Sequence, residues 1–371
     1  MGGQSDFKSG PKSSAKSSPG NFFEDFSLGR DFAHATPRTL TAGDSAVYTA
    51  LYGARFALAS SDEFARAVGL KAAPLDDLLV FHVVFGKTVA DVSLNAIANL
   101  GYAAGVLGAP VYAGDTLDAA STVIGLKENR DGRSGVVYVR TLGRNQRRET
   151  VVDYVRWVMV PKRDPAAPAP EAVVPELPDA VAAEALQVPA GFDAAGYDAV
   201  AAGSPLLWDA YDVGERIDHR DGVTVEEADH MAAARLFQNS ARVHFNRHAE
   251  KDGRFGRRIV YGGHVISIAR TLSFNGVANA FRIAAINGGR HVAPCFAGDT
   301  VYAWSEVVAK AALPGRSDVG ALRLRTVATK DRPTNEFPDR GADGTYDPAV
   351  VLDFDYWALM PRQMAATSRT G

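Results

Sequence analysis

Three residues in the second half of the chain have the chemistry needed for proton transfer and for binding a negative charge. His244 carries an imidazole, whose unperturbed pKa of about 6.5 lets it take up and release a proton near neutral pH. Gly262 and Gly263 stand at the start of a long apolar segment, and their missing side chains allow close approach to the backbone N–H groups. This pattern predicts a catalytic site in the second half.

An internal repeat predicts the elements that must hold these residues. The segment APVYAGDT at 109–116 recurs as APCFAGDT at 293–300, an offset of 184 residues since 293 − 109 = 184. Further on, VRTL at Val139 and LRTV at Leu324 correspond at an offset of 185. Because these matches occur in the same order, we interpret the chain as a tandem duplication of one domain of roughly 150 residues.

Each copy has the same predicted order of elements. The segments 78–101 and 263–285 are long and apolar on all sides, which predicts two buried helices. Several alternating, β-branched segments follow each of them and predict antiparallel strands. The expected fold class is therefore α+β, a tandem (double) hot-dog fold in which each half is an antiparallel sheet wrapped around a central helix. We expect the two sheets to join as a pseudo-dimer.

Composition shifts along the chain suggest the domain boundaries. The linker is rich in Pro and Ala, which predicts an extended segment without a packing role. The expected organisation is a flexible leader at 1–20, an N-terminal hot-dog domain at 21–162, the linker at 163–204, a C-terminal catalytic domain at 205–362 and a tail at 363–371.

The composition excludes several classes of partner. A formal net charge of -3 lacks the positive excess that nucleic-acid binding needs. The longest apolar stretches, such as 78–85, are too short to span a membrane, and His82 within that stretch is expected to be a satisfied core histidine. The single cysteine, Cys295, permits no intrachain disulfide, which fits a reducing compartment such as the cytoplasm.

The stretch 223–267 resembles the signature region of the MaoC-like enoyl-CoA hydratases. The family pattern is an aspartate, then an Asn-Pro pair, then a histidine five residues after the aspartate, followed by a glycine-containing segment that opens the central helix. His244 matches the histidine, and Gly262 with Gly263 match the helix-opening segment. The aspartate position holds Asn239, and an Ala-Arg pair replaces Asn-Pro.

The first copy has lost the same pattern. Its aspartate position falls on Ala54, its histidine position on Ala59, and Asp77 replaces the helix-opening glycine. No proton carrier is left at these positions. We therefore expect one active site per chain, with the first half as a wall of the acyl pocket.

The similarity extends over 20–362 and is greater in stretches such as NFFEDF, VFHVVFGKTVADVSLNAIANLGY and YVRWVMV. These resemble the mesaconyl-CoA hydratases, also called β-methylmalyl-CoA dehydratases, a two-domain branch of the MaoC-like family. The resemblance implies reversible addition of water to mesaconyl-CoA, with an acyl-CoA thioester as partner and no metal or redox cofactor. It is compatible with a homo-oligomer of pseudo-dimeric chains.

Hydration of an enoyl thioester needs a base for water, hydrogen bonds to the developing enolate oxygen and a proton for the α-carbon. His244 is the expected base, and the N–H groups at Gly262 or Gly263 are the expected oxyanion donors. Asn239 cannot exchange a proton, so we expect it to hold the water. The second proton carrier stays unassigned, with Asp229 and Asp62 as candidates.

The second carboxylate of the implied substrate calls for a cation, ideally a guanidinium. Arg55 lies at the lost catalytic loop of the first half and is the candidate for this carboxylate. In the second half, Arg242, Arg257 and Arg258 are candidates for the CoA phosphates. Two alternatives remain open, namely a hot-dog acyl-CoA thioesterase and a non-catalytic acyl-CoA binding module.

Overall fold

A computed structural model describes residues 16–363. Most of the expected leader and nearly all of the expected tail therefore lie outside the described residues. The first half contains β1 (Asp31–Thr39), α1 (Ala42–Tyr52), α2 (Ala57–Ser60), α3 (Asp62–Ala67), α4 (Asp77–Lys87), β2 (Ala98–Leu107), β3 (Thr116–Glu128), β4 (Ser134–Asn145) and β5 (Thr150–Pro161). The second half contains β6 (Arg216–Thr224), α5 (Glu227–Leu236), α6 (Arg242–Phe245), α7 (Arg247–Glu250), α8 (Gly262–Leu272), α9 (Phe274–Val277), β7 (Arg282–His291), β8 (Thr300–Ala312), β9 (Val319–Lys330) and β10 (Val350–Pro361).

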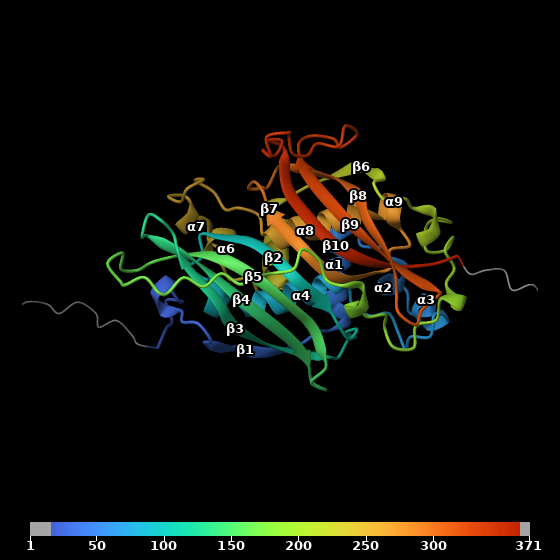
Figure 1. The fold of residues 1–371 in the computed structure, drawn as a ribbon, viewed down its shortest axis with the longest axis horizontal. Helices are drawn as coiled ribbons and strands as arrows, with labels where there is room; N and C mark the ends of the chain where they lie inside the picture. Colours follow the sequence, from blue (N-terminus) through green and yellow to red (C-terminus); the bar gives the residue numbers. More distant parts are fainter. Residues whose placement is uncertain (1–15, 364–371) are drawn as a thin grey trace, which may run out of the picture.

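All ten strands of the described residues form one antiparallel sheet, in the order β1-β3-β4-β5-β2-β7-β10-β9-β8-β6. The two halves join where β2 pairs with β7, for example at Tyr102 opposite Gly289. Figure 1 shows the first half (blue to green) and the second half (yellow to red) side by side in this continuous sheet. The prediction of a double hot-dog fold with joined sheets is confirmed.

Corresponding helices of the two halves keep the spacing of the repeat. The helix α2 begins at Ala57 and α6 begins at Arg242, an offset of 242 − 57 = 185. The central helices α4 and α8 begin at Asp77 and Gly262, again an offset of 262 − 77 = 185. The loop that carries His244 therefore corresponds to the loop that carries Ala59.

The two central helices are shorter than predicted. The helix α4 ends at Lys87, a π-helical turn follows at Val89–Ser93, and β2 begins at Ala98, inside the expected helix. In the same way, α8 ends at Leu272 and β7 begins at Arg282. The helix and the following central strand are both buried, so their apolar residues run on without the alternation that marks a half-exposed strand.

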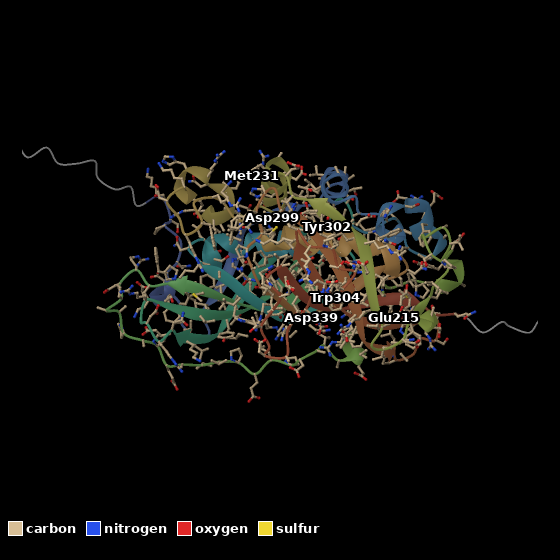
Figure 2. The ribbon with its side chains drawn as sticks, turned by 90° about the horizontal axis from the view of Figure 1, so that it is seen from above. Glu215, Met231, Asp299, Tyr302, Trp304 and Asp339 are labelled. Atoms are coloured by element: carbon tan, nitrogen blue, oxygen red, sulfur yellow. The ribbon has the colours of Figure 1, made fainter. Side chains whose placement is uncertain are left out.

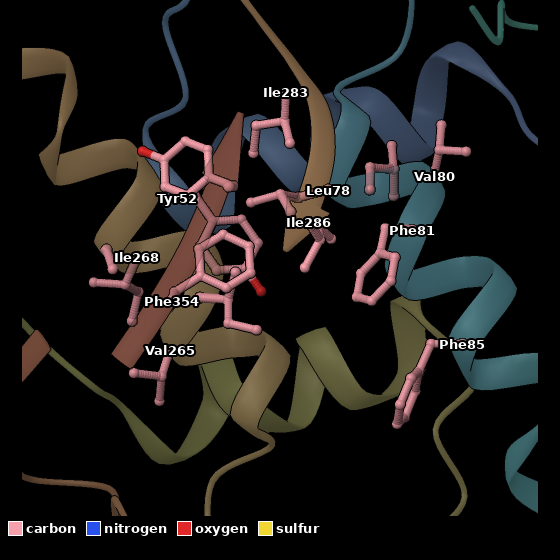
Figure 3. Close-up of a cluster of buried hydrophobic side chains, with 14 of the residues drawn as sticks. Tyr52, Leu78, Val80, Phe81, Phe85, Val265, Ile268, Ile283, Ile286 and Phe354 are labelled. Carbon is pink, nitrogen blue, oxygen red and sulfur yellow. The ribbon is translucent and has the colours of Figure 1, made fainter. Parts of the chain in front are cut away.

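The main core lies between the sheet and the helices α4 and α8. Figure 3 shows Phe81 and Phe85 of α4 directed toward the region occupied by Val265 and Ile268 of α8, with the strand residue Ile286 between them. All these side chains belong to one buried cluster that spans both halves. Because burial of each such side chain contributes about 1.5–3 kcal/mol, neither half is expected to be stable without the other.

The prediction that the linker 163–204 has no packing role is wrong. Val181 is buried, and its carbonyl accepts a 2.9 Å hydrogen bond from the indole of Trp357. Phe192 stacks on Phe281 with 4.5 Å between ring centroids. The prolines exclude regular secondary structure, but they leave apolar side chains free to cover the outer face of the sheet. The linker therefore forms a second buried cluster with the second half and with residues of the α2–α3 region of the first half.

An ion-pair network holds the loop between β9 and β10 of the second half. Arg325 binds Asp353 and Asp339, and its guanidinium lies 5.8 Å from the ring of Trp304. Figure 2 shows Trp304 and Asp339 close together in this region.

No helix among residues 16–363 has the length and hydropathy needed to cross a membrane.

Buried histidines predict that the folded state loses stability in acid. Burial lowers the pKa of His82 and His264 to about 3 and that of His219 to about 4. Between these values and the unfolded value of about 6.5, only the unfolded chain binds the protons, so each histidine removes about 1.4 kcal/mol of stability per pH unit as the pH falls. Asp77 acts in the opposite sense, because burial raises its pKa to about 6.

We therefore expect the urea midpoint of unfolding to fall steadily between pH 7 and pH 5, since these three histidines, together with His244 and His291, whose pKa values burial lowers to about 4, outweigh Asp77. Urea titrations at several pH values, followed by circular dichroism, measure this. A midpoint that stays constant or rises over this range would contradict the assignment of neutral buried imidazoles.

Candidate active site

A cavity of about 370 Å³ lies between the two halves. Aromatic and polar side chains from both halves line it: Phe85, Asn99, Tyr102 and Arg156 from the first, and Asn239, His244, Tyr261, Gly262 and His291 from the second. None of the described residues that line the cavity is Asp or Glu. The structure thus brings together three of the predicted site residues, His244, Asn239 and Gly262, and places a wall of the first half opposite them.

His244 is held in one tautomer by the backbone. It lies on the short helix α6, and its Nδ1 is 3.0 Å from the carbonyl oxygen of Ile259, so Nδ1 must carry the proton and donate it. The ring packs edge-on against Tyr261 at 5.6 Å. Burial lowers the pKa of His244 to about 4, so the imidazole is neutral at pH 7 and its Nε2 has a free lone pair. The fixed tautomer and the available Nε2 lone pair suit a general base, while burial makes this imidazole a weaker base than a solvated one.

Asn239 shapes the loop that carries His244. Its side chain is buried, and its Oδ1 accepts a 3.1 Å hydrogen bond from the backbone N–H of Ala241, two residues further on. Such an Asx turn fixes the direction of the chain as it enters α6. The second lone pair of Oδ1 and the amide nitrogen are the groups left to hold a water molecule, and that role remains a prediction.

The glycine pair opens α8, as predicted. The backbone N–H groups of the first helical turn have no partner within the helix, and the positive end of the helix dipole lies there. A Cβ on Gly262 would lie under 3.0 Å from the ring of His291, and a Cβ on Gly263 would lie under 3.0 Å from the rings of Tyr261 and His82. Only glycine fits at these two positions without displacing a ring. The oxyanion role of their N–H groups remains a prediction.

His291 is a cavity residue that sequence analysis did not identify. It is the last residue of β7, and its Nε2 lies 3.4 Å from the hydroxyl of Tyr102. Burial, and secondarily the nearby His244, lowers the pKa of His291 to about 4. The cavity therefore contains two neutral imidazoles. No sequence pattern marks His291 as a site residue, because it lies at the end of a strand, far along the chain from the motif that contains His244.

The corresponding site of the first half is closed. A space of about 20 Å³ lies beside Ala59, and Asp77, Arg270 and Arg282 also line it. Arg282 pairs with Asp77 at 3.3 Å, and this ion pair occupies the position that the glycines of α8 leave open in the second half. No acyl group fits there, which agrees with the expectation of one site per chain.

The structure separates the four predicted arginines from the cavity lining. Arg55 is exposed and stacks over Phe274 at 4.5 Å, so the prediction that it reaches the shared pocket is wrong. The reason is that the lost catalytic loop of the first half faces its own closed site. Arg242 is exposed on α6, and Arg257 lies 3.8 Å above the ring of Phe296.

Arg258 pairs with Glu227 and does not line the cavity. Contacts of Arg242, Arg257 and Arg258 with CoA phosphates therefore remain predictions.

Two other arginines do line the cavity. Arg254 is exposed. Arg156 comes from β5 and is fully buried.

The candidate carboxylates for the second proton do not reach the site. Asp62 is exposed on α3, where it accepts from the backbone of Ala73 and pairs with Arg66. Asp229 lies on α5 and does not line the cavity either. His82 is fully buried with its Nδ1 3.3 Å from the hydroxyl of Tyr261, which confirms that it is a core histidine, but its Nε2 finds no hydrogen-bond partner among the described residues, so the prediction that it is a satisfied one is wrong.

The chain has two joined hot-dog halves, and a shared cavity between them is lined by His244 and by the first residue of α8, Gly262. This combination is that of a MaoC-like hydratase or dehydratase. The family model described as mesaconyl-CoA hydratase matches residues 6–340. The chain belongs to the mesaconyl-CoA hydratase family.

Individual relatives agree with this placement. Beta-methylmalyl-CoA dehydratase of Chloroflexus aurantiacus is 68% identical over 350 residues, which cover 94% of this chain and 99% of that protein. Mesaconyl-CoA hydratase of Cereibacter sphaeroides is 62% identical over 349 residues, covering 94% of this chain and 100% of that protein.

Solved structures show the same architecture. A MaoC domain protein dehydratase from Chloroflexus aurantiacus has a TM-score of 0.93 at 68% identity and covers 95% of this chain and 100% of that chain. The Mycobacterium tuberculosis protein Rv0216, described as a double hotdog fold, has a TM-score of 0.73 at 26% identity and covers 92% of this chain and 99% of that chain.

Proposed function

We propose that this chain reversibly hydrates mesaconyl-CoA to β-methylmalyl-CoA in the cavity between its halves. The observation that carries the proposal is the neutral imidazole of His244, with Nδ1 bound to the backbone and Nε2 free, in a cavity that also contains the first residue of α8. The names of the two closely similar relatives support the choice of substrate.

In the proposed reaction, His244 Nε2 takes a proton from water while the water oxygen forms a bond to the β-carbon. The electron pair of the double bond moves toward the thioester, and the N–H groups at the start of α8 bind the negative oxygen. The imidazolium then returns its proton to the α-carbon, which is adjacent to the β-carbon. Atoms and charge balance without a metal or redox group.

We assign both proton transfers to His244. Neither Asp nor Glu is among the described lining residues, and the neutral His291 would become an imidazolate if it gave up its proton. The imidazolium of His244 is the stronger acid and already holds the proton. Asn239 takes the part of positioning the water, because an amide hydrogen-bonds without exchanging a proton.

The test is to mix the purified chain with mesaconyl-CoA and to follow the enoyl-thioester absorbance together with a free-thiol reagent. We expect the absorbance to fall to an equilibrium value without thiol release, and the same value to be reached from β-methylmalyl-CoA. Thiol release in step with the absorbance change would instead establish a thioesterase. Binding without conversion would establish an acyl-CoA binding module.

A further inference from the structure

Arg156 is a buried cation without an anionic partner. It lies on β5 with no exposed surface, and its guanidinium stacks 4.2 Å from the ring of Phe85. One nitrogen, Nη2, donates to the hydroxyl of Thr88 at 2.6 Å and contacts that of Ser93 at 3.3 Å. The other two, Nε and Nη1, are buried and find no hydrogen-bond partner in the described chain.

This arrangement is costly in the absence of a ligand. No carboxylate among residues 16–363 forms an ion pair with Arg156, and none of the described lining residues is acidic. Burial accordingly lowers the pKa of Arg156. Buried charges in proteins are normally paired, and an unpaired one destabilises the fold by several kcal/mol. The fold itself does not need it, because the corresponding residue of β10 is Tyr356.

A second unpartnered polar side chain lines the same cavity. Asn99 lies on β2, the strand that pairs with β5, and both its Oδ1 and its Nδ2 are buried without a hydrogen-bond partner. Its amide nitrogen is a further donor beside the two of Arg156. Tyr102, directly opposite Arg156 in the strand pairing, lines the cavity as well. Two adjacent strands of the first half thus carry buried, unpaired donors in the wall of the cavity.

We infer that Arg156, assisted by Asn99, binds the free carboxylate of a dicarboxylic acyl-CoA and makes this cavity selective for such substrates. The inference rests on the proposed function for the identity of the ester. In mesaconyl-CoA the free carboxylate is attached to the β-carbon that water attacks, so its binding site must share the cavity with His244, as Arg156 does. The guanidinium supplies a positive charge, and each of its two unpaired N–H groups can donate a single hydrogen bond to a carboxylate oxygen.

The first experiment compares two enoyl esters that differ only at this group. Mesaconyl-CoA carries the carboxylate, and 2-methylcrotonyl-CoA carries a methyl group in its place. We expect Arg156→Met to lower kcat/KM for mesaconyl-CoA by about 100-fold or more, mostly through KM. The loss for 2-methylcrotonyl-CoA should be much smaller. Arg156→Lys keeps the charge but not the planar guanidinium, and is expected to recover part of the loss.

A matched control and a stability measurement separate binding from structure. Arg55→Met removes an exposed arginine outside the cavity and is expected to leave the ratio of the two kcat/KM values unchanged. In the absence of ligand, Arg156→Met should unfold at an equal or higher urea concentration, because an unpaired buried charge is removed. The inference would be overturned if Arg156→Met lost kcat/KM equally on both esters, so that the ratio of the two values stayed as in the wild type.

The second experiment needs neither a variant nor turnover. Calorimetry on the wild-type chain compares methylsuccinyl-CoA with 2-methylbutyryl-CoA, which are the saturated counterparts of the two esters. We expect the carboxylate ester to bind at least about 10-fold more tightly. Equal affinities would overturn the inference even if Arg156→Met failed to fold. Preferential binding without hydration of any enoyl ester would keep the carboxylate site and refute only the hydratase proposal.

Discussion

His244→Ala is expected to lower kcat/KM for mesaconyl-CoA by about 100-fold to 10,000-fold, the usual contribution of a general base. The loss is large because the described cavity lining offers no carboxylate that could take the proton from water, and its second imidazole, His291, lies on a different element, at the end of β7. Binding of the saturated ester methylsuccinyl-CoA should change little, since the imidazole acts on the water. Stopped-flow absorbance gives the rate, and calorimetry gives the affinity.

A neighbouring histidine provides the control. His248 is exposed on α7, outside the cavity, and His248→Ala should retain wild-type turnover. If His244→Ala turned over mesaconyl-CoA at the wild-type rate, the assignment of the base would be wrong. If His244→Ala also lost its affinity for the saturated ester, the imidazole would have a binding role instead.

Gly86→Ala is expected to damage both stability and turnover. Gly86 lies near the end of α4, and a Cβ there would fall under 3.0 Å from the backbone carbonyl of Phe237. Backbone atoms cannot rotate aside as a side chain can, so the contact forces the two halves apart at a cost of about 1–3 kcal/mol. Phe237 immediately precedes the loop of Asn239 and His244, and a displacement of about 1 Å there can cost about 100-fold in rate.

The control for this variant is Gly288→Ala on β7, where the nearest side-chain atom would lie 4.0 Å from the new Cβ. Urea unfolding and kcat/KM should both stay near wild type in that variant. The account of the contact between the halves fails if Gly86→Ala matches Gly288→Ala in both measurements.

The architecture could be predicted from the sequence because the duplication is visible in short matched segments. The repeat of AGDT turns, with strands of alternating residues after them, is enough for two joined hot-dog halves. The ends of α4 and α8 could not be predicted, since β2 and β7 are partly or largely buried and lack the strict alternation of buried and exposed residues that marks a half-exposed strand. The packing of the linker was missed because proline content says little about where Val181 and Phe192 go.

The candidate site could be predicted only where it is local in sequence. His244, Asn239 and Gly262 belong to one motif, and the structure brings all three to the cavity. Arg156 had a weaker signal, which is a charge on the inward face of a strand whose other inward residues, such as Tyr154 and Val158, are buried and mostly apolar. Asn99 and His291 had no such signal, because only the pairing of distant strands brings them to the site.

The most direct test of the whole account is a crystal structure of this chain with methylsuccinyl-CoA bound. The expected result places the thioester oxygen at the N–H groups of Gly262 and Gly263, with the β-carbon beside Nε2 of His244, in the cavity between the halves. The account would be contradicted by an acyl chain in the closed site beside Ala59, or by a thioester that lies away from both His244 and the start of α8.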